Sequence, residues 1–251
     1  MSQITSDVES FYQDAAKYWS DIPATVNGML GGFGSISSTD IQGSKQLLKQ
    51  LFKSKFPPGR EYALDCGAGI GRVTKFLLTD LFDKVDMVEQ NPIFLEKARN
   101  YLGTNLLDKK IGKMFPIGLQ DFIPEPCQYD VIWAQWVLGH LTDDDFVKFF
   151  INCQTGLKPN GVIIAKENVT FTEEIVVDEK DSSVTRPMGL LKELFSKAGL
   201  HIYRLSKQTN FPKGLFTVYM FVLKPEDRVD EPDDKKQDEL DRTLDNNNQN
   251  K

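Results

Sequence analysis

The sequence predicts an α/β fold in which a doubly wound, mostly parallel sheet follows a helical extension. Three observations support this prediction. From residue 59 onward, short apolar segments alternate with amphipathic helical patterns, which is typical of repeated βα units. A glycine-rich turn lies where the first apolar segment meets the first helical pattern. The last two apolar segments have no helical pattern between them, which predicts an antiparallel pair of strands at one edge of the sheet.

Residues 1–58 form the predicted helical extension. Apolar residues recur at helical spacing over residues 7–20, and a proline ends that helix. The glycine-rich segment 28–34 predicts a loop, after which a second helix begins. The candidate N-cap residues of this second helix are Ser37, Ser38 and Asp40. The sequence Pro57-Pro58-Gly59 then marks the boundary with the main domain, residues 59–224.

The main domain contains seven predicted strands. The first five lie at residues 62–66, 84–89, 113–117, 129–135 and 161–166. The predicted helices lie at residues 73–81, 91–102, 143–156 and 187–198. The closing pair of strands lies at residues 201–207 and 215–223. Because parallel strands are joined by crossover helices, we expect helices on both faces of the sheet.

The charge of the chain is concentrated at its C-terminus. The formal net charge is −6, and the segment 225–251 contributes −5 of it with ten acidic and five basic residues. This segment has no aromatic residue and little apolar surface, so it is predicted to be a disordered acidic tail. The rest of the chain carries 26 acidic and 25 basic residues. A body this close to neutral indicates no direct binding to nucleic acid.

Neither a membrane span nor a secretory signal is expected. No apolar run approaches the roughly 20 residues of a transmembrane helix, and the first residues contain neither a basic start nor an apolar core. The three cysteines are too few and too scattered for a disulfide framework or a four-ligand zinc site, so no metal is expected. We therefore expect a cytoplasmic or nuclear protein.

The glycine-rich turn reads Asp65-Cys66-Gly67-Ala68-Gly69-Ile70-Gly71. Its glycines let the backbone approach a ligand closely, and the following helix offers free N–H groups. Glu89 ends the second predicted strand, where a carboxylate can accept hydrogen bonds from a ribose. The spacing G-x-G-x-G resembles the S-adenosylmethionine (SAM) motif of class I methyltransferases, and Asp65 suits a ligand that bears an ammonium and a sulfonium. A dinucleotide site for NAD or FAD and a purely structural turn are the alternatives.

Further motifs make the resemblance more specific. They are Tyr18-Trp19, the segment 26–34, Gln135-Trp136-Val137-Leu138-Gly139-His140-Leu141 and Asp181-Ser182-Ser183. Together they resemble the protein α-N-terminal methyltransferases, which methylate the α-amine of proteins that begin with Xaa-Pro-Lys or Xaa-Pro-Arg. The resemblance covers residues 8–224. It implies a Rossmann-like, seven-stranded class I methyltransferase sheet whose last strand is antiparallel, with the N-terminal extension covering the active site.

The resemblance also implies the residues of the site. SAM would contact Gly67, Arg72, Glu89, Asn91, Leu119, Gln120 and Gln135. The substrate peptide would contact Trp19, Trp136, Asn168, Asp178, Asp181 and Ser183. The catalytic residues would be His140, Asp181 and Asn168, with His140 and Asp181 near the reacting amine. Family analogy suggests ribosomal or chromatin proteins as substrates and a monomeric enzyme.

Each of these residue types suits the chemistry, and each has a structural alternative. A histidine titrates near neutrality and can take a proton, but it can also be structural. Acidic residues at 178 and 181 can pair with a substrate cation, or form a solvated loop. Asn168 can donate to a peptide carbonyl or form an Asx turn, and the tryptophans can wall a substrate slot or belong to the core.

Three functions therefore remain open at this point. The first is SAM-dependent methylation of protein α-amines. The second is methylation of a small molecule or of a lysine side chain on the same fold. The third is a SAM-binding, non-catalytic partner of another methyltransferase.

Overall fold

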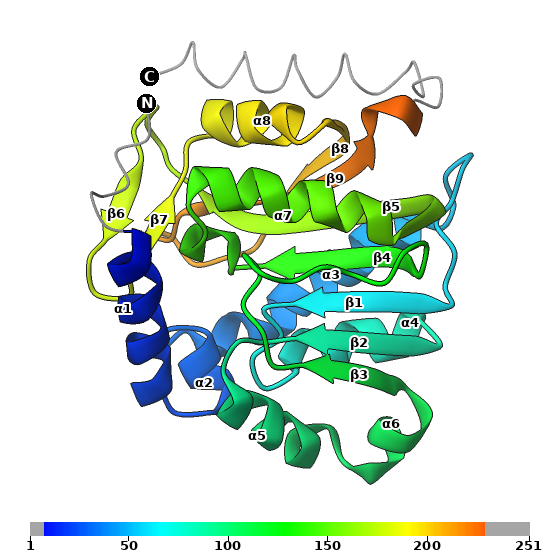
Figure 1. Ribbon diagram of the computed structural model, residues 1–251, viewed down its shortest axis with the longest axis horizontal. Coiled ribbons are helices and arrows are strands. Elements are labelled where there is room, and N and C mark those ends of the chain that lie inside the picture. The colour runs from blue at the N-terminus through cyan, green and yellow to red at the C-terminus, as the bar shows by residue number, and fades with distance from the viewer. Residues whose placement is uncertain (1–7, 229–251) are drawn as a thin grey trace.

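The computed structural model describes residues 8–228, which form a seven-stranded sheet with the order β3-β2-β1-β4-β5-β9-β8 (Figure 1). The strands are β1 (Tyr62–Cys66), β2 (Lys84–Val88), β3 (Ile111–Phe115), β4 (Tyr129–Gln135), β5 (Leu157–Val169), β8 (Leu200–Lys207) and β9 (Thr217–Pro225). β9 runs antiparallel to both of its neighbours, and the other pairs are parallel. The predicted doubly wound sheet with an antiparallel last strand is confirmed.

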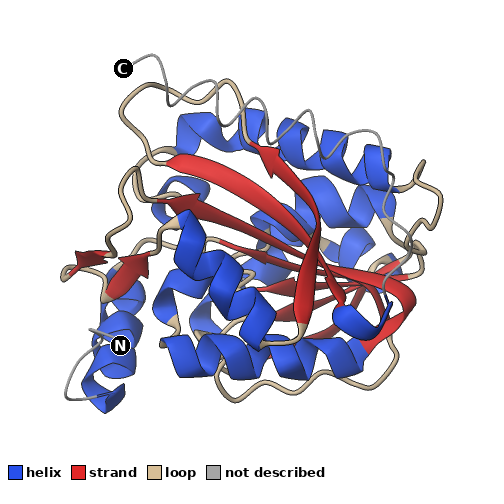
Figure 2. Cartoon of the chain, turned by 90° about the horizontal axis from the view of Figure 1, so that it is seen from above, coloured by secondary structure: helices blue, strands red, loops and turns tan. Residues whose placement is uncertain are grey.

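Helices cover both faces of this sheet (Figure 2). One face packs against α3 (Ser37–Leu51), the helical segment 72–81 and α5 (Pro92–Leu102). The segment 72–81, predicted as one helix, contains a π-helical stretch at Thr74–Leu78 followed by α4 (Thr79–Leu81). The opposite face packs against α7 (Asp143–Gly156) and α8 (Met188–Lys197). A short helix, α6 (Thr104–Lys109), leads into β3.

The apolar strand β4 shows how the two cores are built. Its side chains alternate between the faces, so Trp133 packs with the α3 core while Ile132 packs with the α7 core. Both residues are fully buried. A central parallel strand must be apolar on both faces, which explains its continuous apolar sequence.

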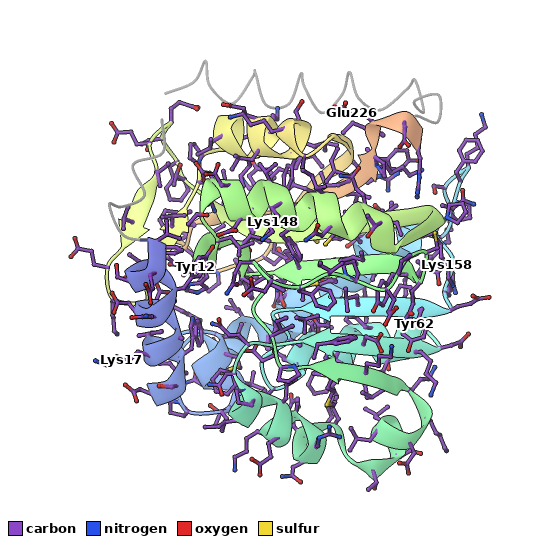
Figure 3. All side chains as sticks on the ribbon, viewed as in Figure 1. Tyr12, Lys17, Tyr62, Lys148, Lys158 and Glu226 are labelled. Atoms are coloured by element: carbon purple, nitrogen blue, oxygen red, sulfur yellow. The ribbon has the colours of Figure 1, made fainter. Side chains whose placement is uncertain are left out.

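The carboxyl ends of the parallel strands point to one side of the molecule, where α1 (Val8–Asp21) and α2 (Val26–Met29) lie (Figure 1). A small hairpin of β6 (Val176–Asp178) and β7 (Ser183–Thr185) lies on the same side. Sequence analysis predicted no strands there. Figure 3 shows Tyr12 of α1 at this side, and Tyr62 and Lys158 at the opposite side. Three separate parts of the chain therefore meet at the carboxyl edge of the sheet.

Two other differences from the sequence prediction concern element ends. β5 is longer than predicted at both ends, because residues up to Val169 pair with β9. β9 includes Pro225, and the turn Glu226–Arg228 follows it, with Arg228 Nη1 donating to the Lys158 carbonyl at 2.9 Å. The remainder of the predicted acidic tail lies outside the described residues. Within residues 8–228, no helix is long and apolar enough to cross a membrane.

Candidate active site

A first cavity opens at the carboxyl ends of β1, β2 and β4. Six of the seven residues predicted to contact SAM line it, namely Gly67, Arg72, Glu89, Leu119, Gln120 and Gln135. Val88, Phe94 and Ile117 add apolar surface to its wall. The cavity thus combines a polar end with an apolar slot, which is how sites for small molecules and cofactors are usually built.

The glycine turn brings backbone, rather than side chains, to the wall of the first cavity. Gly67 has φ +71°, and a Cβ there would lie 2.5 Å from Val137 Cγ2, so this position requires glycine. Gly67 N and Ala68 N both donate to the Val88 carbonyl, at 2.9 and 3.0 Å. These bonds fix the turn against the end of β2, next to Glu89.

Glu89 is a partly buried carboxylate that holds two backbone segments together. Its Oε2 accepts from Gly69 N and its Oε1 accepts from Asn91 N, both at 2.9 Å. Burial raises the pKa of Glu89 despite these donors. Asn91 itself is not among the residues that line the cavity. Its side chain caps α5 instead, by accepting from Ile93 N at 3.0 Å.

Asp65 does not face the first cavity, so the expectation that it suits a cationic ligand is wrong for this geometry. Its Oδ2 accepts from Thr74 N at 3.0 Å and from the Thr74 hydroxyl at 2.5 Å. Burial raises its pKa to about 6. Asp65 therefore fixes the helical segment that follows the glycine turn.

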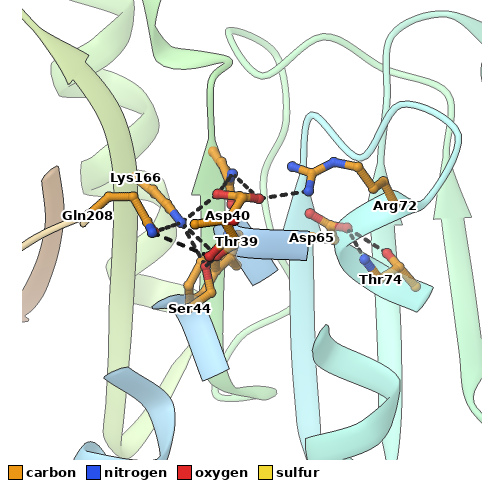
Figure 4. Close-up of polar contacts among 10 residues, drawn as sticks. Thr39, Asp40, Ser44, Asp65, Arg72, Thr74, Lys166 and Gln208 are labelled. Atoms are coloured by element: carbon orange, nitrogen blue, oxygen red, sulfur yellow. Dashed lines mark hydrogen bonds and ion pairs between the residues drawn. The ribbon is translucent and has the colours of Figure 1, made fainter. Parts of the chain in front are cut away.

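A buried ionic cluster stands behind the first cavity (Figure 4). Asp40 lies at its centre and binds Arg72, Gln135 and Lys166. Asp40 was predicted as a candidate N-cap, which is wrong because α3 begins at Ser37 and Asp40 is fully buried within it. Burial opposes its ionisation, but the neighbouring Lys166 and Arg72 outweigh that effect and lower its pKa.

A second cavity adjoins the first. Six of the seven predicted substrate and catalytic residues line it, all except Asp178. They are Trp19, Trp136, His140, Asn168, Asp181 and Ser183. Phe33, Phe211 and Phe216 add apolar surface. Asp178 lies in a neighbouring side cavity, which also contains Asn168 and Asp181. The first and second cavities share the wall formed by Trp19, Met29, Trp136 and His140.

The turn after β4 places Trp136 in this shared wall. Trp136 has φ +52°, an uncommon conformation for a bulky residue. Its backbone N donates to the Lys166 carbonyl at 3.0 Å, and the next two amides, of Val137 and Leu138, donate to Glu167 Oε1 at 2.9 Å. Burial raises the pKa of Glu167 to about 7. The Trp136 indole N–H is buried and has no acceptor among the described residues.

Arg186 supports the same turn from the other side. Its guanidinium donates to the carbonyls of Leu138 and Leu141, at 2.9 and 2.6 Å, and pairs with Asp143 at 2.9 Å. Sequence reasoning assigned no role to Arg186 or Glu167. The signal that could have found Glu167 is its place at the end of an apolar, central strand, where a charged residue needs a buried partner.

His140 is held in one tautomer by two contacts. The Trp19 indole N–H donates to its Nε2 at 3.0 Å, so Nε2 carries no proton. Nδ1 lies 3.3 Å from the Ser182 carbonyl, to which it donates. Burial lowers the pKa of His140, and the opposing influence of Asp181 is smaller. His140 is therefore neutral at pH 7, with its basic nitrogen directed at α1.

The two predicted acidic residues differ in their surroundings. Asp181 is half-buried, and its Oδ1 accepts from the Ser183 hydroxyl at 2.6 Å. Asp178 is exposed at the end of β6 and accepts from Lys180 N at 2.9 Å. The hairpin thus places one carboxylate inside the second cavity and the other at its rim.

Residues 7–224 match a family described as AdoMet dependent proline di-methyltransferase. The N-terminal Xaa-Pro-Lys N-methyltransferase 1 of Xenopus tropicalis is 47% identical over 225 residues, which cover 89% of this chain and 99% of that protein. The alpha N-terminal protein methyltransferase 1 of Drosophila melanogaster is 50% identical, with coverage of 89% and 80%.

Solved structures show the same similarity. A SAM-dependent methyltransferase from Leishmania major superposes with a TM-score of 0.81 and 38% identity, and the match covers 88% of each chain. The mitomycin 7-O-methyltransferase is 21% identical with a TM-score of 0.59, over 84% of this chain and 60% of that one. The second match concerns the fold alone.

Proposed function

This chain belongs to the AdoMet dependent proline di-methyltransferase family, and on that premise we propose that its first cavity binds SAM and its second an Xaa-Pro-Lys or Xaa-Pro-Arg N-terminus. The protein is a SAM-dependent methyltransferase of protein N-termini, which confirms the predicted family, activity and cofactor. One observation links the activity to the site: the two cavities share the wall of Trp19, Met29, Trp136 and His140. A methyl group could cross from donor to acceptor only where two such sites meet.

We assign the polar end of the first cavity to the charged and hydroxylated parts of SAM. Glu89 uses one lone pair on each oxygen for a backbone amide, so each oxygen can still accept from a ribose hydroxyl. Arg72 and Gln135 carry donors that suit the carboxylate of the methionine moiety. The apolar slot beside Leu119 suits a flat adenine ring. That Asn91 contacts SAM stays a prediction; its backbone N–H donates to Glu89 and its side chain caps α5.

We assign the second cavity to the substrate peptide. Asn168 would donate to a backbone carbonyl, and Trp19 and Trp136 would enclose the first residue and the proline. The unpartnered indole N–H of Trp136 gives a ligand carbonyl or carboxylate a buried donor. Asp181, with Ser183 bonded to it, would receive the cation of the third residue, and Asp178 would add charge at the rim.

The chemistry requires a neutral amine. An α-amine has a pKa of about 8 against about 10.4 for lysine, so roughly a tenth of it is neutral at pH 7. SAM would supply the electrophilic methyl group to the lone pair of this amine, and the sulfur of SAM would keep the electron pair of its former bond to the methyl carbon. The displaced proton can go to His140 Nε2, provided that the Trp19 indole N–H has first left that atom.

The alternatives predicted from the sequence have weaker support. Relatives that match 89% of this chain are methyltransferases of protein N-termini, not of small molecules. Neutral His140 and half-buried Asp181 in the second cavity also favour catalysis over a non-catalytic partner role. That the substrates are ribosomal or chromatin proteins, and that a monomer acts in the cytoplasm or nucleus, stay predictions. Light scattering of the purified chain and cell fractionation would test the last two.

Three short peptides test the proposed function. A Ser-Pro-Lys peptide should gain methyl groups that fragment-ion mass spectrometry places on the α-nitrogen. An N-acetylated copy, which still has its lysine amine, should gain none. A Ser-Pro-Glu peptide should react poorly, because it brings a carboxylate next to Asp181. Methylation of the acetylated copy would instead favour a lysine methyltransferase.

A further inference from the structure

Building on the assignment of the first cavity to SAM, we propose that Asp40 is a positioning residue for the cofactor. Its buried carboxylate, carried by α3, holds Arg72 and Gln135 in the orientation in which they line that cavity. The N-terminal extension would then have two roles. It would orient two side chains of the SAM site through Asp40, and it would place Trp19 at the wall that the two cavities share.

The contacts place Asp40 directly behind the cavity wall. Arg72 Nη1 donates to Asp40 Oδ2 at 2.7 Å, and Gln135 Nε2 lies 2.9 and 3.0 Å from the two carboxylate oxygens. Asp40 is 0% exposed, Arg72 5% and Gln135 7%. Arg72 and Gln135 line the first cavity, whereas Asp40 is not among its lining residues. Asp40 can therefore influence a ligand only through these two side chains.

The Gln135 amide is fixed from both sides. Its Oε1 accepts from Trp133 Nε1 at 3.1 Å, and its NH₂ group faces Asp40. Arg72 has five N–H donors, and its contact with Asp40 uses one nitrogen, which leaves donors for a ligand. Its guanidinium carbon lies 5.7 Å from the centre of the Trp136 ring. Without the Asp40 carboxylate, Arg72 and Gln135 would lose the acceptor that holds them in this orientation.

Asp40 is itself anchored to the sheet by Lys166 of β5. Lys166 Nζ lies 2.5 Å from Asp40 Oδ1, and it also donates to Ser44 Oγ at 2.9 Å and Gln208 Oε1 at 2.8 Å (Figure 4). The cluster contains one carboxylate and two cations, Arg72 and Lys166. Arg72 also interacts electrostatically with the buried carboxylate of Asp65.

Two variants test the role of Asp40. Asp40→Asn keeps the shape but removes the carboxylate that Arg72 and Lys166 share. It is therefore paired with Asp40→Asn/Lys166→Met, which keeps the summed charge of positions 40, 72 and 166 unchanged. The matched control is Asp86→Asn. Asp86 is also 0% exposed and accepts from the hydroxyls of Tyr62 and Tyr129, but it lines neither cavity.

The measurements are the Kd of SAM by calorimetry and the KM of a Ser-Pro-Lys peptide at saturating SAM. For the folded Asp40 variants we expect SAM to bind at least about tenfold more weakly, with the peptide KM changed less than about threefold. Asp86→Asn should change neither value by more than about threefold. A wild-type Kd for SAM in a folded Asp40 variant overturns the proposal. So does a parallel loss of SAM and peptide, because a merely structural role predicts that pattern.

Arg72→Gln separates this proposal from the one on which it is built. If Arg72→Gln weakens SAM and the Asp40 variants do not, only the positioning role is wrong. If Arg72→Gln also leaves the Kd unchanged, the assignment of Arg72 to SAM is wrong, and the positioning role with it.

Hydrogen exchange of the wild-type protein decides the case in which neither Asp40 variant folds. Coupling between sites is reciprocal, so SAM should slow exchange in α3 around Asp40. The control helix is α8 on the opposite face, where SAM should have a smaller effect. Equal protection of α3 and α8, or no added protection of α3, overturns the proposal.

Discussion

Each of the two cavities has a glutamate in its wall, but the two glutamates are held in different ways. Glu89 accepts from Gly69 N on one oxygen and from Asn91 N on the other, whereas Glu167 accepts the amides of Val137 and Leu138 on the single oxygen Oε1. Glu89 lies in the wall of the first cavity and Glu167 in the wall of the second. Both oxygens of Glu89 can still accept a hydrogen bond from a ligand, whereas the bonds to Glu167 hold the turn after β4 in place. The difference suggests that Glu89 is a ligand-binding residue and Glu167 a supporting one.

Glu167→Gln tests the supporting role and has the largest expected effect. Burial raises the pKa of Glu167 from 4.5 in its ordinary state to about 7. A folded-state pKa above the unfolded value gives stability that is fully present below pH 4.5 and is lost as the pH rises through 7. This loss amounts to up to about 3 kcal/mol. Glutamine does not titrate, so the variant should lack this loss.

Urea unfolding at pH 4.5 and pH 8 measures this pH-dependent loss of stability. The wild type should lose more unfolding free energy between the two pH values than Glu167→Gln. Glu193→Gln is the control, because Glu193 is exposed on α8 and forms an ion pair with the exposed Lys197. Equal losses in the wild type and Glu167→Gln would mean that Glu167 is not buried in solution as described.

Glu89→Ala tests the ligand-binding role of the other glutamate. Loss of a charged acceptor for ribose hydroxyls should weaken SAM binding by roughly 1.5–3 kcal/mol, which is at least about tenfold. Calorimetric titration with SAM measures the change, and circular dichroism checks the fold. The peptide KM at saturating SAM should change much less. An unchanged Kd for SAM would remove Glu89 from the cofactor site.

How well each cavity could be predicted from the sequence depends on how far apart its interacting residues lie along the chain. The glycine turn is local: its three glycines and Asp65 lie within seven residues, and all three glycines have a positive φ, which favours glycine. Asp40 illustrates the opposite case. Its partners Arg72, Gln135 and Lys166 lie 32, 95 and 126 residues away, so no local pattern indicates that this aspartate is buried. Local propensity favoured an N-cap, and tertiary pairing overrode it.

The second cavity was predicted by family resemblance and not by local pattern. The hairpin that carries Asp178 and Asp181 has only three residues in each strand, and exposed Val176 and Val177 lie among acidic residues. Its strands are too short for a period-two pattern to distinguish them from a loop. Asp65 was misjudged for the opposite reason. Its place in a ligand-binding motif suggested a contact with the ligand, but its carboxylate accepts from Thr74 instead.

The two acidic residues of the hairpin give a smaller expected effect within the second cavity. Asp181→Asn should raise the KM of a Ser-Pro-Lys peptide by about tenfold, because the substrate cation would lose its half-buried carboxylate partner. Asp178→Asn should raise it by no more than about threefold, because exposed ion pairs contribute little. Steady-state rates on Lys and Glu peptides measure both. Equal effects of the two substitutions would show that burial does not determine how much each carboxylate contributes to peptide binding.

Trp19→Phe has the smallest expected effect and tests the contact at the shared wall. The Trp19 indole N–H donates to His140 Nε2, which favours the neutral imidazole beyond what burial alone does. Phenylalanine keeps an aromatic ring but removes this donor, which is worth about 0.5–1.5 kcal/mol, so the pKa of His140 should rise toward its usual value. An NMR titration of the two histidines measures the change without any substrate, and His201, which lines neither cavity, is the reference in the same spectrum. The pKa of His201 should stay where it is. If the pKa of His140 is also unchanged, the Trp19 indole does not donate to Nε2 in solution. Nε2 could then accept the proton of the substrate amine without any movement of α1.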